Sequence, residues 1–492
     1  MKLKAFAVVF FCLLGLFLFK NNWKQMNNKI LKAGFPTSVL FKNETLLEPS
    51  NLETTQEYYL LENLSATMLR YSEDLSGEFV GYLSDSWVVT GKNAIFKLKK
   101  NLRWSDGLSI TCSEVVSNFK KILSRPHRHL QAFKKIKDIK CSLDESEVVF
   151  SFHGSPPSTF FHELTLADTG LTKELFDRQS WKVTSGPYSV SDVDVVKKEI
   201  TLRKNNFVAM PLSPHCPDVV LLREVPFNLE NPLDDSLDNA VDYIAPQGWS
   251  FLQNVNHLID SAPKKVEGKP SLVHFISFIR GDDNVRKAIK VAVEKTNSKD
   301  ELIPKNTHRY NEVIPPGYNG YLNLNQNASD TVIPALKETL LIVARAPYQN
   351  LTGWMNQLKA EAIKVGVDVL FEFGDITDPE LKNRSGNVAV LGLFKGNLKD
   401  PIGSWSFLSD PKHGALRGYS SFVETALSKA VETDDQATKS KILSDLHREL
   451  LEKHIIIPLW CESLFMLYNK NVSAIHVNQF DFRIHFYEVQ MN

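Results

Sequence analysis

The segment 94–123 constrains the fold more than any other part of the sequence. It opens on alternating apolar and charged residues, which is the pattern of a half-buried strand. Asp106 and Gly107 then predict a tight turn, because glycine tolerates the positive φ that such turns demand. Thr111 and Glu114 have the spacing of a capping box, and apolar residues follow at helical spacing. The segment therefore predicts a strand, a turn and an amphipathic helix.

The overall charge excludes one class of partner. Lys+Arg and Asp+Glu are equal, at 57 each, so the formal net charge is zero. A chain that binds nucleic acid or an anionic membrane through its overall field carries an excess of basic residues. We therefore expect no nucleic-acid partner. The length of 492 residues predicts about three domains and is ample for a large core.

The first residues are typical of an export signal. Lys2 and Lys4 precede an apolar run over residues 5–19, and Lys20 closes it. This run is shorter than the about 20 residues of a membrane-spanning helix, but it matches the core of a secretory signal. No A-x-A cleavage pattern follows, so residues 1–22 are either a signal peptide or a retained signal anchor. We expect a periplasmic or extracytoplasmic location, with anchoring to the cytoplasmic membrane as an open alternative.

The cysteines allow two interpretations. Beyond the apolar run the chain has Cys112, Cys141, Cys216 and Cys461. Their wide spacing matches no zinc-binding pattern. An oxidising compartment permits one or two disulfides. Four separate half-buried thiols fit the sequence equally well.

One basic stretch stands out from the neutral whole. Residues 120–140 contain eight Lys and Arg residues against Asp138 alone. Such a run could dock an acidic partner or a wall polymer. A solvated surface is the more ordinary interpretation of a charge run.

The second half of the chain alternates between strands and helices. Apolar strands are predicted over residues 272–279, 340–344, 365–373, 388–394 and 455–460, with helices over 284–295 and 354–364 and two more before the last of these strands. This order favours right-handed parallel strand–helix–strand units. A polar stretch, 260–270, predicts a boundary before the first strand. The alternating residues 482–489 predict a final strand.

Several motifs follow one another in the order found in a known family. They occupy residues 47–49, 81–89, 94–123, 184–188, 202–207, 284–289, 315–317, 364–369 and 400–401. With these motifs the sequence resembles the extracytoplasmic solute-binding proteins of the peptide/oligopeptide-binding family (family 5), the receptors of ABC importers. Each motif alone is weak, but their common order is specific.

The resemblance implies an α/β protein with the two-lobe, hinged periplasmic-binding-protein fold, type II-like, with an extra subdomain in the first lobe. Lobe I would comprise residues 28–270 plus 471–492, with the inserted subdomain at about 50–165. Lobe II would comprise residues 271–470. The lobes would close over a ligand in the cleft between them.

The function implied by the resemblance is that of a receptor. It would capture peptides in the interlobe cleft and deliver them to an ABC permease in the cytoplasmic membrane, without a cofactor or metal. The sequence contains no H-E-x-x-H, G-x-S-x-G, Walker or G-x-G-x-x-G motif, so we expect no enzyme. Two alternatives stay open: a receptor for a specialised non-peptide solute (a metal chelate or thiol peptide), or an anchored sensor or adhesin without transport.

The loop that follows residue 394 departs from the family pattern. The family holds the ligand's α-amino group with an aspartate shortly before an Asp-Pro pair, and Asn397 stands at that position here. Phe394 replaces the family tryptophan. Asparagine provides no charge, so an ammonium group would lose a charge-assisted hydrogen bond. Either the ligand is a blocked or modified peptide, or Asp400 has taken over the charge.

Other candidate ligand-binding residues are chosen by position. They are Ser38 and Val39 after the first predicted strand, Tyr348 and Gln349 after the strand 340–344, Gly396 in the loop before Asp400, and Trp405 beyond that loop. A peptide receptor should bond mainly to the backbone of its ligand, because main-chain groups are common to all peptides. Core packing is the alternative role for Trp405.

Overall fold

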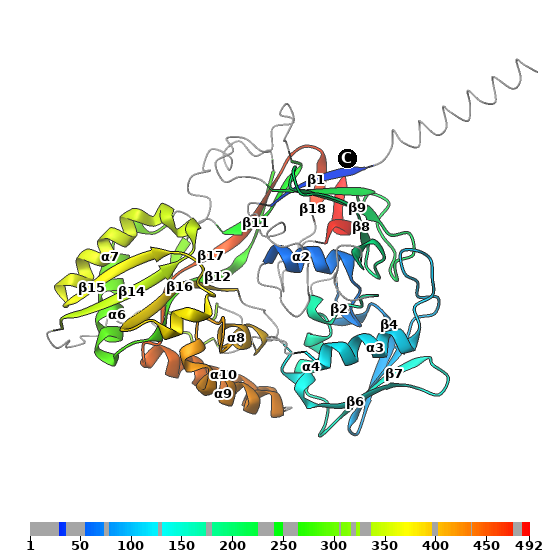
Figure 1. Cartoon of the computed structure of the whole chain (residues 1–492), viewed down its shortest axis with the longest axis horizontal. Coiled ribbons are helices and arrows are strands. Elements are labelled where there is room, and N and C mark those ends of the chain that lie inside the picture. Colours follow the sequence, from blue (N-terminus) through cyan, green and yellow to red (C-terminus); the bar gives the residue numbers. More distant parts are fainter. Residues whose placement is uncertain are drawn as a thin grey trace, which may run out of the picture.

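The structure is a computed structural model that describes residues 29–35, 55–72, 78–125, 130–173, 180–224, 241–248, 264–304, 307–315, 321–324, 336–395, 402–433, 435–475 and 485–492. In these residues helices and strands alternate around one large sheet and a smaller one (Figure 1). The α/β class predicted from the sequence is confirmed. No helix in the described ranges has both the length and the apolar character to span a membrane, and residues 1–22 lie outside those ranges.

The large sheet runs through the whole molecule. In spatial order its strands are β15 (Val367–Phe373), β14 (Glu338–Ala344), β16 (Asn387–Lys395), β12 (Lys264–Arg280), β17 (Ile456–Tyr468), β11 (Tyr243–Gly248), β1 (Ile30–Phe35), β10 (Val219–Glu224), β9 (Glu199–Lys204) and β8 (Tyr188–Asp194), and β13 (Thr307–Arg309) also pairs with β17. β14 pairs in parallel with both β15 and β16, as the strand–helix–strand order predicted.

The remaining strands form smaller sheets. The four-stranded sheet has the order β4 (Ser84–Thr90), β5 (Asn93–Leu98), β7 (Glu147–Phe152) and β6 (Ile136–Cys141), and two pairs join β2 (Leu69–Tyr71) to β3 (Phe79–Gly81) and β18 (Val472–Ile475) to β19 (Val489–Met491). The α-helices are α2 (Thr55–Leu64), α3 (Cys112–Leu123), α4 (Ser158–Glu163), α6 (Asp283–Asn297), α7 (Thr352–Lys364), α8 (Ile402–Leu408), α9 (Ser420–Glu432) and α10 (Gln436–Glu452).

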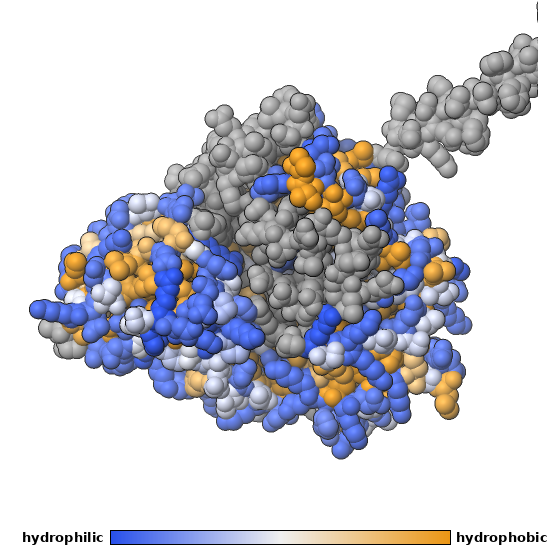
Figure 2. Space-filling view, in the orientation of Figure 1, coloured by the Kyte–Doolittle hydropathy of each residue, from blue (hydrophilic) through white to orange (hydrophobic). Residues whose placement is uncertain are grey.

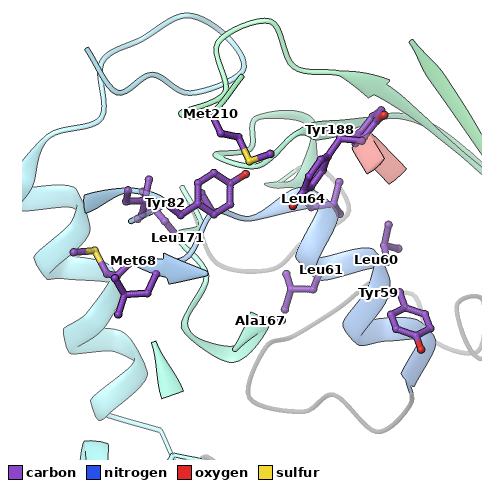
Figure 3. Close-up of a cluster of buried hydrophobic side chains, with 14 of the residues drawn as sticks. Tyr59, Leu60, Leu61, Leu64, Met68, Tyr82, Ala167, Leu171, Tyr188 and Met210 are labelled. Atoms are coloured by element: carbon purple, nitrogen blue, oxygen red, sulfur yellow. The ribbon is translucent and has the colours of Figure 1, made fainter. Parts of the chain in front are cut away.

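Buried apolar side chains gather in three cores. The first core draws on residues 31–243, Leu272 and residues 464–491. Figure 3 shows part of it around α2, with Leu64 beside Tyr188 and Leu61 beside Ala167. The second and third cores draw on residues 275–460, and alternate residues of β16 belong to one or the other. Helices therefore cover both faces of the parallel strands. On the face shown in Figure 2, the described residues are mostly hydrophilic, with apolar residues in scattered patches.

Two long antiparallel strands connect the parts of the molecule built on these cores. β12 and β17 pair from Lys264 opposite Tyr468 to Ser277 opposite Ile456. The sequence predicted an interruption of regular structure over the polar stretch 260–270, but residues 264–270 form the start of β12. The pairing register shifts on both sides of Pro270, so the proline is accommodated at a bulge.

The predicted strand–turn–helix segment is confirmed. β5 is followed by Gly107 at φ +86° and by the capping box of α3. The Thr111 N–H donates to Glu114 Oε2 at 2.8 Å, and the Glu114 N–H donates to Thr111 Oγ1 at 3.2 Å. A disulfide joins Cys112, at the start of α3, to Cys141, at the end of β6. The other two cysteines beyond the apolar run carry free, buried thiols.

The predicted final strand is wrong in part. Phe486–Glu488 form a 3₁₀ turn and β19 begins at Val489, while residues 482–484 lie outside the described residues. The backbone N–H of Phe486 donates to the side chain of Asn63 at 2.8 Å, so it is not free for a strand ladder. Phe486 and Tyr487 are both buried, which a half-buried strand with two-residue alternation does not allow.

Candidate functional site

The carboxyl ends of two sets of parallel strands converge on one short stretch of β17. β16 runs in the same direction as β17 and ends with Lys395 opposite Leu272, which in turn pairs with Glu462 of β17. β11 runs the opposite way and ends with Gly248 opposite Leu464. β1 and β10 are parallel to β11 (Figure 1). Ligands of open α/β sheets bind outside the carboxyl ends of the strands, so this convergence defines the candidate binding site.

Five of the predicted site residues follow these strand ends in the sequence. Ser38 and Val39 follow β1, and Gly396, Asn397 and Asp400 follow β16. All five lie outside the described residues. Their assignment to the site stays a prediction based on sequence position.

The structure brings two of the predicted residues together. Phe394, at the end of β16, and Trp405, on α8, are both buried in the second core with ring centroids 5.5 Å apart. The indole N–H of Trp405 has no hydrogen-bond partner among the described residues. A buried donor left without an acceptor costs about 1–3 kcal/mol.

The other two described candidates lie elsewhere. Gln349 is exposed, in the 3₁₀ turn after β14. Tyr348, its neighbour, is buried in the third core, on the other face of the strands from Phe394 and Trp405. The hydroxyl of Tyr348 lies 2.8 Å from Nδ1 of His274, and burial raises the pKa of that hydroxyl well above its usual value.

Sequence reasoning missed a buried pair of polar side chains on β12 and β17, next to the point where the strand ends converge. Nε2 of His274, on β12, lies 2.7 Å from Oε1 of Glu462, on β17, and neither side chain is exposed. The His274 ring stacks on Trp460 with centroids 5.3 Å apart. A histidine within an otherwise apolar strand was the available signal, but its partner is far away in the sequence. The pair ties together the two strands that cross between the cores.

Two side-chain contacts that the sequence did not reveal join the part of the molecule around the first core to the helices of the second core. The ammonium of Lys135 lies 2.7 Å from Oε1 of Glu432, and Gln131 hydrogen-bonds to Ser406. The hydrogen bond from Lys135 holds the pKa of the Glu432 carboxyl below its usual value. These residues lie far apart in the sequence, so the contacts exist only while the two parts are held against one another.

The same interface contains a buried ammonium group. Lys439 of α10 is only 3% exposed, and its Nζ lies 2.6 Å from Ser158 Oγ and 3.2 Å from Thr159 Oγ1 at the start of α4. No carboxylate of the described residues forms an ion pair with it. Hydroxyl groups alone compensate poorly for the desolvation of a charge.

The fold and the converging strand ends define a two-part α/β binding protein of the periplasmic type. The family model described as bacterial extracellular solute-binding proteins, family 5, middle region, matches residues 78–412, which is more than half of the chain. The chain belongs to this family of solute-binding proteins.

Solved structures share this fold across nearly the whole chain. A dipeptide-binding protein from Pseudoalteromonas sp. SM9913, in complex with Met-Leu, superposes with a TM-score of 0.74 at 14% identity, covering 94% of this chain and 100% of the other. The clavulanic acid biosynthesis oligopeptide binding protein 2 superposes with a TM-score of 0.72 at 16% identity, and the match covers 94% of this chain and 95% of the other. NikA from Brucella suis, in complex with Fe(III)-EDTA, superposes with a TM-score of 0.72 at 15% identity, and the match covers 94% of this chain and 100% of the other. At these identities the likeness shows the fold alone.

A curated relative from Haemophilus influenzae carries only the general name of a binding protein. It is 26% identical over 130 residues, which are 26% of this chain. The match spans 24% of the length of that relative.

Within the described ranges, no cluster of three or more His, Cys, Asp or Glu side chains could hold a metal ion.

Proposed function

We propose that the chain is an extracytoplasmic receptor that binds peptides between two lobes, delivers them to an ABC permease in the cytoplasmic membrane and catalyses no reaction. The observation that carries this proposal is the convergence of the strand ends of both parts on Glu462–Leu464, in a chain of the solute-binding family. A similar protein was solved with the dipeptide Met-Leu. The first residues, 1–22, would direct export and either be removed or anchor the receptor.

The lobes that we propose are residues 28–270 plus 471–492 and residues 271–470. The separation of the first core from the other two supports this division. The inserted subdomain at about 50–165 would contain the four-stranded sheet. The two strands β12 and β17 would form the hinge, because they alone among the described strands contribute buried residues to cores on both sides.

A specialised non-peptide solute is the second candidate ligand. Asn397 provides no charge for a peptide α-amino group. A neighbour with a TM-score of 0.72, against 0.74 for the dipeptide-binding protein, was solved with Fe(III)-EDTA. Both observations favour a ligand that does not depend on a free amino terminus.

Native mass spectrometry of the protein purified without added ligand separates these candidates. We expect a heterogeneous set of short peptides, in which blocked amino termini are as frequent as free ones because Asn397 does not select an ammonium. The N397D variant should shift the set toward free amino termini, since a carboxylate there would restore a charge-assisted hydrogen bond. The exposed N383D variant serves as the control and should not change the set.

Three results would contradict these expectations. One uniform non-peptide mass would support the specialised-solute receptor instead. Peptides with free amino termini only, from the unaltered protein, would show that another group such as Asp400 provides the charge. An empty protein that gains no mass from a mixture of di- to pentapeptides would favour a sensor or adhesin.

The buried Lys439 gives a way to alter closure without touching the ligand. Replacing Ser158, which is exposed beside Thr159, by aspartate should place a carboxylate next to the ammonium. A charge-assisted hydrogen bond contributes about 1.5–3 kcal/mol, so we expect peptide affinity to rise about tenfold through a larger closed population. Isothermal titration calorimetry measures the change.

A double-mutant cycle provides the control for this prediction. In the K439M background, the S158D substitution should no longer raise affinity, because no ammonium remains to meet the carboxylate. The same gain in both backgrounds would show that the effect does not pass through Lys439.

A further inference from the structure

A basic groove lies on the four-stranded sheet, apart from the converging strand ends of the large sheet. It has a volume of about 570 Å³ and runs between α3 and the end of β6. Its polar lining consists of Ser113, Ser117, Lys120, Lys121, Ser124 and Lys140. Four of these residues belong to α3 and Ser124 is its C-cap; the five recur at intervals of three and four positions, which places them on one side of the helix.

Every polar side chain of this groove can donate hydrogen bonds, the serine hydroxyls can also accept them, and all six side chains are exposed. Lys121 and Lys140 form no ion pair within the described residues. Lys120 is 3.9 Å from Asp138, but both side chains are more than half exposed, so this pair is weak. The groove therefore has a net positive charge in a molecule whose overall charge is zero.

The two walls of the groove are covalently joined. The disulfide between Cys112 and Cys141 connects the start of α3 to the end of β6, and Cys141 itself lines the groove. The spacing of helix and strand is therefore set before any partner arrives. Such preorganisation lowers the entropy cost of binding.

One wall of the groove is an edge strand. β6 pairs with β7 on one side and, within the described residues, with no strand on the other. An edge strand offers unpaired backbone N–H and C=O groups to an extended polypeptide. Lysines on an edge repel another basic edge and attract an acidic one, so the charges restrict which segment can pair.

We propose that this groove binds an extended acidic segment of a partner protein, which adds to the edge of β6 while its carboxylates meet Lys120, Lys121 and Lys140. The lysines alone would accept any polyanion. The edge strand favours a polypeptide, because only a polypeptide backbone continues a strand ladder. This interaction is additional to the capture of solute between the lobes.

Fluorescence anisotropy with a labelled ten-residue peptide of alternating Glu and Thr tests the proposal on the full chain. The triple variant K120E/K121E/K140E should bind the peptide at least about tenfold more weakly, because three favourable charge contacts become repulsive. The triple variant K92E/K97E/K100E changes the net charge equally, at exposed lysines on β5 and in the turns on either side of it, outside the groove. It should bind within about twofold of the unaltered protein, since screening limits the effect of distant charges.

A second peptide tests the strand addition. Methylating alternate backbone nitrogens on the pairing edge should weaken binding, because those nitrogens can no longer donate to β6. Equal weakening by both triple variants would show diffuse charge attraction and overturn the proposal. Unchanged binding of the methylated peptide, or stronger binding of inorganic polyphosphate than of the peptide, would also overturn it in favour of a phosphate polymer. Failure of the unaltered protein to bind the peptide overturns it outright.

Discussion

Replacing Glu462 by alanine is expected to lower the free energy of unfolding by about 3–5 kcal/mol. The carboxylate lies 2.7 Å from Nε2 of His274, and both side chains are fully buried. The substitution removes a partner from a polar group that water cannot reach, which costs far more than the loss of an exposed ion pair. Urea unfolding followed by tryptophan fluorescence measures the loss.

Two variants make this result specific. E462Q keeps an oxygen that can accept from the histidine, so it should lose less stability than E462A. E424A removes an exposed carboxylate from α9 and should change the free energy of unfolding by no more than about 0.5 kcal/mol. If E462A unfolded at the urea concentration of the unaltered protein, the His274–Glu462 contact would have no stabilising role.

The double variant C112A/C141A is expected to lose about 3–4 kcal/mol of stability in the part of the molecule that contains the four-stranded sheet. The bond links residues 29 positions apart, and closing a loop of that length restricts the unfolded chain by about this amount. Denaturation monitored by hydrogen exchange of the β6 and β7 amides measures the change locally.

Reductant provides the control for the disulfide. The unaltered protein in dithiothreitol should match the double variant, and the double variant should not respond to reductant. Cys216 is a free, buried thiol, so C216S should keep the full response to reductant. Identical unfolding of the unaltered protein with and without reductant would contradict the prediction.

Local features were predictable from the sequence because their partners are close in the chain. The capping box of α3 needs only Thr111 and Glu114, and both side chains bond as the spacing predicted. The parallel pairing of β14 and β15 follows from the helix between them. The family motifs then gave the overall class, which composition alone would not have provided.

Features that depend on distant pairing were not predictable. The polar start of β12 is a strand because β17, far along the chain, pairs with it. The spacing of the cysteines left two interpretations open, and the fold brings the Cα atoms of Cys112 and Cys141 to 6.0 Å. The buried His274–Glu462 contact and the contact of Lys439 with Ser158 were not predictable for the same reason: their partners are far apart in the sequence. The predicted ligand-binding roles of Ser38 and Asn397 rest on the sequence alone.

The return of the chain to the first core has a consequence for biosynthesis. The amide of Met491 donates to the carbonyl oxygen of His215 at 3.0 Å, and residues 464–491 fill a core whose other members nearly all lie before residue 244. On a ribosome, the early strands must wait for the last segment before they can complete this core, with the edge of β11 unpaired until β17 emerges. Contacts this distant in sequence form slowly. The first core therefore stays incomplete until the last residues have been made.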